Sequence, residues 1–88
     1  MSVDGLPDTP TANAHAYLVK IRDEMIRLFG IGRDEAEGRI RRQWADQAGF
    51  HEDELLRELP DYWAKWIYYG QVKFWLYDEE SLPPSPYP

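Results

Sequence analysis

The chain contains no cysteine, two histidines and three serines, and it has no long apolar run. Without cysteine it can form no disulfide, no thiolate metal site and no cysteine nucleophile. The two histidines, His15 and His51, are far apart and have no further ligands at metal-binding spacing. The acidic first residues resemble neither a signal peptide nor a membrane span. We therefore expect a cytoplasmic protein with no metal and no cofactor.

The sequence also offers few groups for catalysis. Its serines lie near the two ends of the chain, so a serine triad would lack an ordered nucleophile. His51 precedes three carboxylates at 52–54 and could act as an acid–base group, but this arrangement is more typical of a solvated helix start. Gly30-x-Gly32 is followed by charged residues, which is not a phosphate-binding loop. We expect no enzymatic activity.

Size and charge limit the partners of this chain. Its 88 residues are enough for one domain. The formal net charge of −6 disfavours non-specific attraction to nucleic acid or to an anionic membrane. Acidic residues gather in 1–10, 52–58 and 78–80, whereas 20–46 is nearly neutral and rich in arginine. A basic target would therefore be drawn to one end of the molecule.

Apolar residues recur at helical spacing in four segments, which predicts helices at 11–29, 34–48, 52–58 and 60–69. Gly30 and Gly70 follow the first and last of them, where glycine suits a left-handed cap. Asp34 and Glu37 resemble a capping box at the start of the second helix. The residues expected in the core are Leu18, Ile21, Met25, Leu28, Ile40, Trp44, Leu55, Leu59, Trp63, Trp66 and Ile67.

The stretch from Leu59 to Tyr77 holds eight of the thirteen aromatic residues. After Gly70 its helical spacing changes to alternation, which predicts a short extended or β-like arm at 71–77. A single strand must pair with a second copy, another protein or its own chain, or continue as helix. Outside the domain at 11–77, we expect a flexible lead at 1–10 and a disordered, acidic, proline-rich tail at 78–88. The expected fold class is a small, mainly α-helical single domain.

The second predicted helix carries a glycine and several arginines. Gly38 costs about 1 kcal/mol relative to alanine inside a helix, which is best explained by the close approach of another backbone. Arg39, Arg41 and Arg42 follow a glycine-containing turn, the outline of a helix-turn-helix. A DNA-binding protein is therefore the alternative function. Against it, each arginine has a carboxylate four residues away, which is typical of a self-neutralised surface.

Two short sequence segments resemble parts of other proteins. They are Gly-Arg-Ile-Arg-Arg-Gln-Trp at 38–44 and the aromatic segment that runs from Tyr62-Trp63 to Ile67-Tyr68-Tyr69-Gly70. Both are similar to segments of small uncharacterised bacterial proteins from GC-rich genomes. The resemblance covers about half of the chain. It implies a bacterial cytosolic origin and carries no function.

These observations favour a protein-interaction module of the inhibitor, immunity or adaptor type, acting on a protein partner or on a second copy of itself. Tryptophan and tyrosine are frequent interface anchors, and there are more large aromatics here than so small a core easily encloses. The alternative is that all of them are structural. The candidate protein-binding residues are Tyr62, Lys65, Tyr69, Phe74, Trp75 and Tyr77.

Overall fold

The computed structural model describes residues 5–7, 9, 11–44 and 52–87. Within these residues it contains four α-helices and no strand, which confirms the prediction of a small, mainly α-helical domain. Residues 45–48 of the second predicted helix and His51 lie outside the described part. The helices are α1 (Ala12–Phe29), α2 (Arg33–Trp44), α3 (Glu52–Arg57) and α4 (Pro60–Tyr68).

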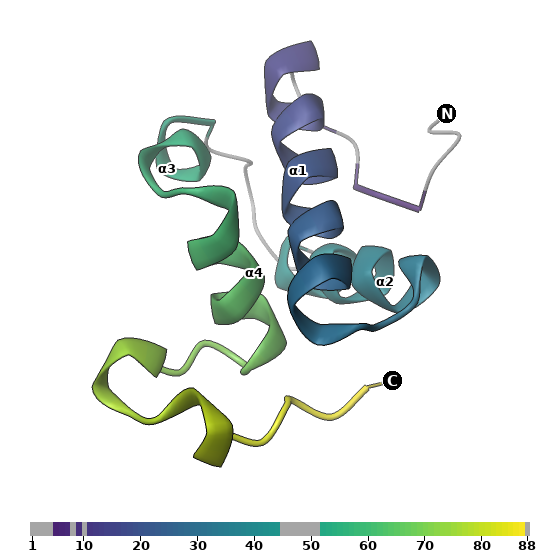
Figure 1. The fold of residues 1–88 in the computed structure, drawn as a ribbon. Coiled ribbons are helices and arrows are strands. Elements are labelled where there is room, and N and C mark those ends of the chain that lie inside the picture. Colours follow the sequence, from purple (N-terminus) through teal and green to yellow (C-terminus); the bar gives the residue numbers. More distant parts are fainter. Residues whose placement is uncertain (1–4, 8, 10, 45–51, 88) are drawn as a thin grey trace.

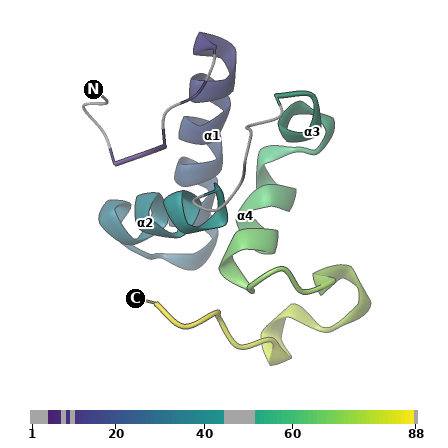
Figure 2. The ribbon, with the colours of Figure 1, turned by 180° about the vertical axis from the view of Figure 1, so that it is seen from behind.

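The longest of these helices, α1, lies at the centre of the fold. Each of the other three helices contacts it. Figures 1 and 2 show α4 running beside α1, α2 lying across the C-terminal end of α1, and α3 beside the N-terminal part of α4. The chain after α4 returns beneath α4 and α2. The two ends of the described chain therefore both lie on the side of α2.

Local sequence explains where α1 and α4 begin and end. The Thr11 hydroxyl accepts a hydrogen bond from the Ala14 N–H at 3.1 Å, and Gly30 closes α1 in a left-handed conformation. After α4, the Gln71 N–H donates to the Trp66 carbonyl at 2.7 Å, and Gly70 has a φ of 75°. Gln71 also has a positive φ, 66°, which is rare for a residue other than glycine.

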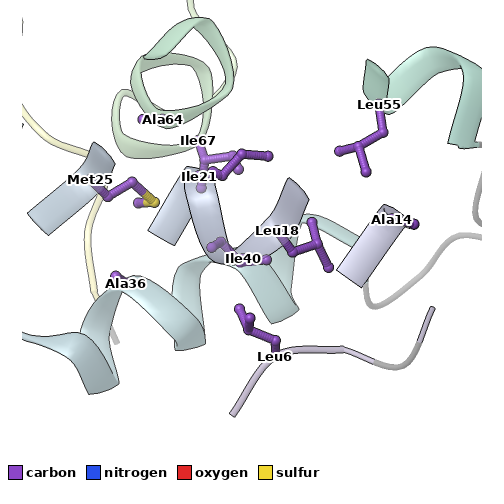
Figure 3. Packing of buried hydrophobic residues seen from close by; sticks show 10 residues of the cluster. All are labelled: Leu6, Ala14, Leu18, Ile21, Met25, Ala36, Ile40, Leu55, Ala64 and Ile67. Atoms are coloured by element: carbon purple, nitrogen blue, oxygen red, sulfur yellow. The ribbon is translucent and has the colours of Figure 1, made fainter. Parts of the chain in front are cut away.

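The core is built around one apolar stripe of α1. Its members, three or four residues apart, have no exposed surface. Figure 3 shows how they meet side chains from the other helices and from the lead segment. The buried cluster consists of Leu6, Ala14, Leu18, Ile21, Met25, Ala36, Ile40, Leu55, Ala64 and Ile67. Six of the predicted core residues are among them, and Leu28, Trp44 and Trp63 pack against the cluster while partly exposed.

One predicted core residue, Leu59, was wrongly assigned. Its side chain is 70% exposed. Leu59 precedes Pro60, the first residue of α4, and has an extended backbone with φ −71° and ψ 156°. Helical spacing therefore does not apply to it. The residue before a proline is pushed out of the helical conformation, and its side chain leaves the face that the helix buries.

The predicted arm at 71–77 contains no strand. Phe74–Leu76 form a 3₁₀-helix instead. Two of its N–H groups form local hydrogen bonds: Phe74 donates to the Val72 carbonyl at 2.7 Å and Leu76 to the Lys73 carbonyl at 3.0 Å. The expected extended or β-like backbone is thus corrected to a tight turn. The local hydrogen bonds of Phe74, Leu76 and Tyr77 replace part of the pairing that a strand would require.

A buried carboxylate connects the lead segment with α1 and α2. Glu37 is 4% exposed and accepts hydrogen bonds from Arg22 Nη1 and Arg33 Nε, each at 3.1 Å, and from the Gly5 N–H at 3.2 Å. Arg41 donates to the Gly5 carbonyl. The predicted capping box is therefore wrong, since α2 already begins at Arg33 and Glu37 faces the arginines.

The contacts of Glu37 determine its ionisation. Burial would raise the pKa of this carboxyl, but hydrogen bonds from Arg33, Arg22 and the Gly5 N–H outweigh burial and hold the pKa below its ordinary value of 4.5. A lowered pKa means that the folded protein favours the charged form more than the unfolded chain does. The ionised carboxylate therefore stabilises the fold.

A first prediction concerns the central stripe. Ile21→Ala should lower the free energy of unfolding by about 2–5 kcal/mol, because it leaves a cavity at a site with no exposed surface. Leu59→Ala, at an exposed position, is the control and should change stability by less than about 0.5 kcal/mol. Urea denaturation followed by far-UV circular dichroism measures both. Equal losses would contradict this description of the core.

A second prediction concerns Glu37. Its stabilising contribution should be fully present above about pH 4.5 and be lost as the pH falls through the lower folded pKa. Glu37→Gln should lower stability at neutral pH by about 1–3 kcal/mol. It should also flatten the acid limb of the stability profile. Urea unfolding at a series of pH values tests this, and parallel profiles for the two proteins would refute it.

Candidate interaction surface

Four aromatic rings from α4 and the following turn form one continuous cluster, which we call the aromatic face: Tyr62, Trp66, Phe74 and Trp75. Tyr62 and Trp66 lie one turn apart on α4, with ring centroids 6.2 Å apart and planes within 10°. The turn after α4 brings Trp75 alongside both, 5.9 Å from Tyr62 and 6.5 Å from Trp66. These separations are typical of favourable aromatic pairs.

The aromatic face has a buried inner part and an exposed outer part. The Phe74 side chain is 8% exposed; its ring lies 5.5 Å from that of Tyr62 and 5.7 Å from the Lys65 Nζ. Trp75 is 54% exposed and its neighbours Leu76 and Tyr77 are 66% and 58% exposed. Phe74 thus fixes the turn to the helix, and the residues after it present apolar surface to solvent.

The structure brings most, but not all, of the candidate protein-binding residues together. Tyr62, Lys65, Phe74 and Trp75 lie in or beside the aromatic face, and exposed Tyr77 follows it directly. Tyr69 lies elsewhere. It is 9% exposed, and its ring contacts Phe29 of α1 at 5.6 Å.

The position of Trp66 in the aromatic face was not predicted. Its helical spacing with Trp63 favoured a place in the core. In the structure Trp66 is half-buried and stacks with Tyr62 and Trp75. The signal that could have identified it is the i,i+4 spacing from Tyr62, which places two rings on one surface of a helix.

Exposed acidic residues stand close in the sequence to both ends of the segment that carries the aromatic face. Asp61 is exposed at the start of α4, and Asp78 and Glu80 are exposed just beyond Tyr77. Asp78 closes the local turn, because its carbonyl accepts from the Ser81 N–H at 2.9 Å and its carboxylate from the Glu80 N–H at 3.2 Å. The exposed residues Trp75–Tyr77 are therefore followed directly in the chain by exposed carboxylates.

The predicted recognition helix, α2, has its arginines engaged within the molecule. Arg39 is 6% exposed and pairs with Glu35 at 2.9 Å. This confirms one predicted i,i+4 pair. The expected pair of Glu37 with Arg41 is wrong, because Glu37 contacts Arg22 and Arg33. Asp46, the expected partner of Arg42, lies outside the described residues.

Gly38 is explained by a side chain and not by the expected backbone. A Cβ added at this position would overlap the hydroxyl of Tyr87 and lie 2.8 Å from its Cζ. The Tyr87 ring also lies 5.3 Å from the Arg39 Cζ and 5.0 Å from the Arg42 Cζ. The tail, expected to be disordered, thus contributes a side chain to the surface of α2.

Three further findings bear on function. Among the described side chains, no group of three or more histidines and carboxylates lies close enough together to hold a metal ion. Within the same part of the chain, no helix has both the length and the apolarity needed to cross a membrane. Comparison with protein-family models, with curated proteins and with solved structures gave no match to this chain.

A third prediction separates structural tryptophan from surface tryptophan. Trp63 packs against Trp44 at 5.6 Å, and its Nε1 donates to the Leu55 carbonyl at 2.8 Å. Trp63→Ala should therefore cost about 3–5 kcal/mol of stability. Trp75→Ala loses mainly ring contacts at an exposed site and should cost about 1 kcal/mol. Urea denaturation measures both, and equal costs would show that Trp75 belongs to the core.

Proposed function

We propose that this chain is a small acidic protein-interaction module, of the inhibitor, immunity or adaptor type, that binds a basic surface of a larger protein through the aromatic face. One observation carries the proposal: Trp75, Leu76 and Tyr77 are each more than half exposed on a turn that Phe74 fixes to α4. We infer a non-catalytic role in the bacterial cytoplasm.

The energetic support comes from the size and position of the exposed indole. A tryptophan side chain can bury roughly 150–250 Å². Covering the exposed half of Trp75 would contribute about 2–3 kcal/mol at ~25 cal/mol/Å². Because the indole already stacks with Tyr62 and Trp66, little conformational freedom is lost on binding. Such a residue has the properties of an interface hot spot.

Charge supports a basic partner over a second copy of the chain. A guanidinium group can lie on the Trp75 ring while it pairs with a nearby carboxylate such as Asp78. The net charge of −6 strengthens the attraction to a basic protein and speeds encounter. Two copies meeting through this face, each with a net charge of −6, would repel one another.

The DNA-binding alternative receives less support from the contacts of α2. Arg39 is buried beside Glu35 and Tyr68, and Arg42 donates to the Pro86 carbonyl at 2.9 Å. A recognition helix needs such side chains free to reach base edges. We therefore rank DNA binding second.

A fourth prediction tests the proposed function with a defined probe. A short amphipathic peptide of arginine and leucine should bind with micromolar affinity and less tightly as salt rises. Trp75→Ala should weaken this binding at least tenfold, a factor of ten being about 1.4 kcal/mol. Leu59→Ala, which removes an exposed leucine outside the aromatic face, should not change it. Isothermal titration calorimetry gives the affinities.

Two controls distinguish the proposal from its alternatives. A peptide with glutamate in place of arginine should not bind, and random duplex DNA should not bind at physiological salt. Equal affinity of the wild type and Trp75→Ala for the basic peptide would overturn the proposal. Salt-dependent duplex binding that Arg42→Glu removes would favour the DNA-binding alternative.

A further inference from the structure

The segment 85–87 occupies a site formed by α2 and the end of α4. Its backbone is held at two points, since the Ser85 N–H donates to the Tyr68 carbonyl at 2.8 Å and the Pro86 carbonyl accepts from Arg42 Nη1 at 2.9 Å. Figures 1 and 2 show this part of the chain, in yellow, passing beneath α4 towards α2. The contacts therefore join the last described residues to a distant part of the sequence.

The Tyr87 ring is the main side chain in this site. Both guanidinium groups, those of Arg39 and Arg42, lie within cation–π distance of it, at 5.3 Å and 5.0 Å from the ring centroid. Arg39 also lies 4.9 Å from the centroid of Tyr68, whose ring stacks on Phe29 at 3.7 Å. Tyr87 thus extends a series of stacked groups that begins in α1.

The floor of the site is Gly38. Any larger residue there would overlap the Tyr87 hydroxyl, so the glycine is the feature of α2 that admits a tyrosine. Beside the segment lies a cavity of about 140 Å³, lined in part by Arg42, Gln43 and Gln71. The site therefore has the shape and the cationic groups to receive an aromatic ring, and it is larger than the segment that fills it.

The connection between this segment and the helical domain resembles a short linker. Residues 78–81 form a local turn through hydrogen bonds to Asp78, and Pro83 and Pro84 are exposed. Prolines restrict the segment to extended conformations, which lowers the entropy lost on docking. The linker also carries three carboxylates at 78–80, opposite in charge to the arginines of the site.

We propose that the Gly38, Arg39 and Arg42 surface is a binding site for an extended Ser-Pro-Tyr segment and that it accepts residues 85–87 of a second copy in place of its own. A second copy presents the same segment, so each contact within one chain is replaced by the same contact between two chains. The connected segment has an effective concentration in the millimolar range. The closed monomer therefore dominates in dilute solution, and tail exchange produces a dimer only when the protein is concentrated.

Two variants test this proposal by complementation. Gly38→Ala blocks the site and leaves a tail with an intact tyrosine. Tyr87→Ala leaves an open site and a tail that cannot fill it. Each variant on its own should be monomeric, whereas a mixture should form a heterodimer in which one chain supplies the site and the other the tyrosine. Sedimentation equilibrium of the mixture should show association at least tenfold tighter than that of either variant with itself.

A matched control uses Tyr87→Phe, which keeps the ring and should fill its own site. A mixture of Tyr87→Phe with Gly38→Ala should therefore associate no more tightly than the wild-type protein associates with itself. Alanine favours a helix more than glycine does, so Gly38→Ala should remain folded, which circular dichroism checks. A folded Gly38→Ala and Tyr87→Ala pair that stays monomeric at millimolar concentration would overturn the proposal. The proposal would also be overturned if Gly38→Ala associated as tightly with Tyr87→Phe as with Tyr87→Ala.

Tail exchange is independent of the aromatic face. Adding Trp75→Ala to both members of the complementing pair should leave their association unchanged. If this substitution abolished the heterodimer, the contact would run through the aromatic face and the tail-exchange proposal would fail. The basic-peptide experiment is unaffected by either result, so the two proposals can succeed or fail separately.

Discussion

The fold depends on one constraint, the burial of a single apolar stripe on α1. Ala14, Leu18, Ile21 and Met25 have no exposed surface, and every other α-helix in the described chain packs against α1. Helices as short as α3 and α4, with six and nine residues, are unstable in isolation. They persist because α1 supplies the apolar surface they need. The aromatic face, which begins on α4, is therefore positioned by contacts on the opposite side of that helix.

Periodicity predicted the parts of the fold that repeat along the chain. The helices begin and end close to the predicted positions, because apolar spacing and glycine caps are local signals. The predicted end of the second helix, at 48, lies outside the described residues. The same reasoning placed Leu18, Ile40 and Leu55 correctly in the core. It failed at Leu59, where a following proline removes the residue from the helix, and at Trp66, where the side chain has ring partners outside the core.

The contacts that sequence analysis could not predict join residues far apart in the chain. Glu37 is buried because groups from the lead segment, α1 and α2 converge on it, and no spacing rule describes such a meeting. Tyr87 likewise packs against Gly38, which lies about fifty residues earlier in the chain. Gly38 did signal that something approaches α2 closely, but a missing side chain does not identify its neighbour. The candidate surface could therefore be predicted in part: Tyr62, Phe74 and Trp75 were expected there, but neither Trp66 nor the arrangement of the rings was.

The turn after α4 links both proposed surfaces. Gln71 holds a left-handed backbone that costs a residue other than glycine about 1–3 kcal/mol. Its side chain joins the turn to α2, since Nε2 donates a hydrogen bond to Gln43 Oε1 at 3.0 Å. The path of the chain after α4, towards Trp75 and then Tyr87, depends on the φ and ψ angles of this residue. Gln71 therefore sets the direction in which the chain leaves α4, and its bond to Gln43 holds the start of the turn against α2.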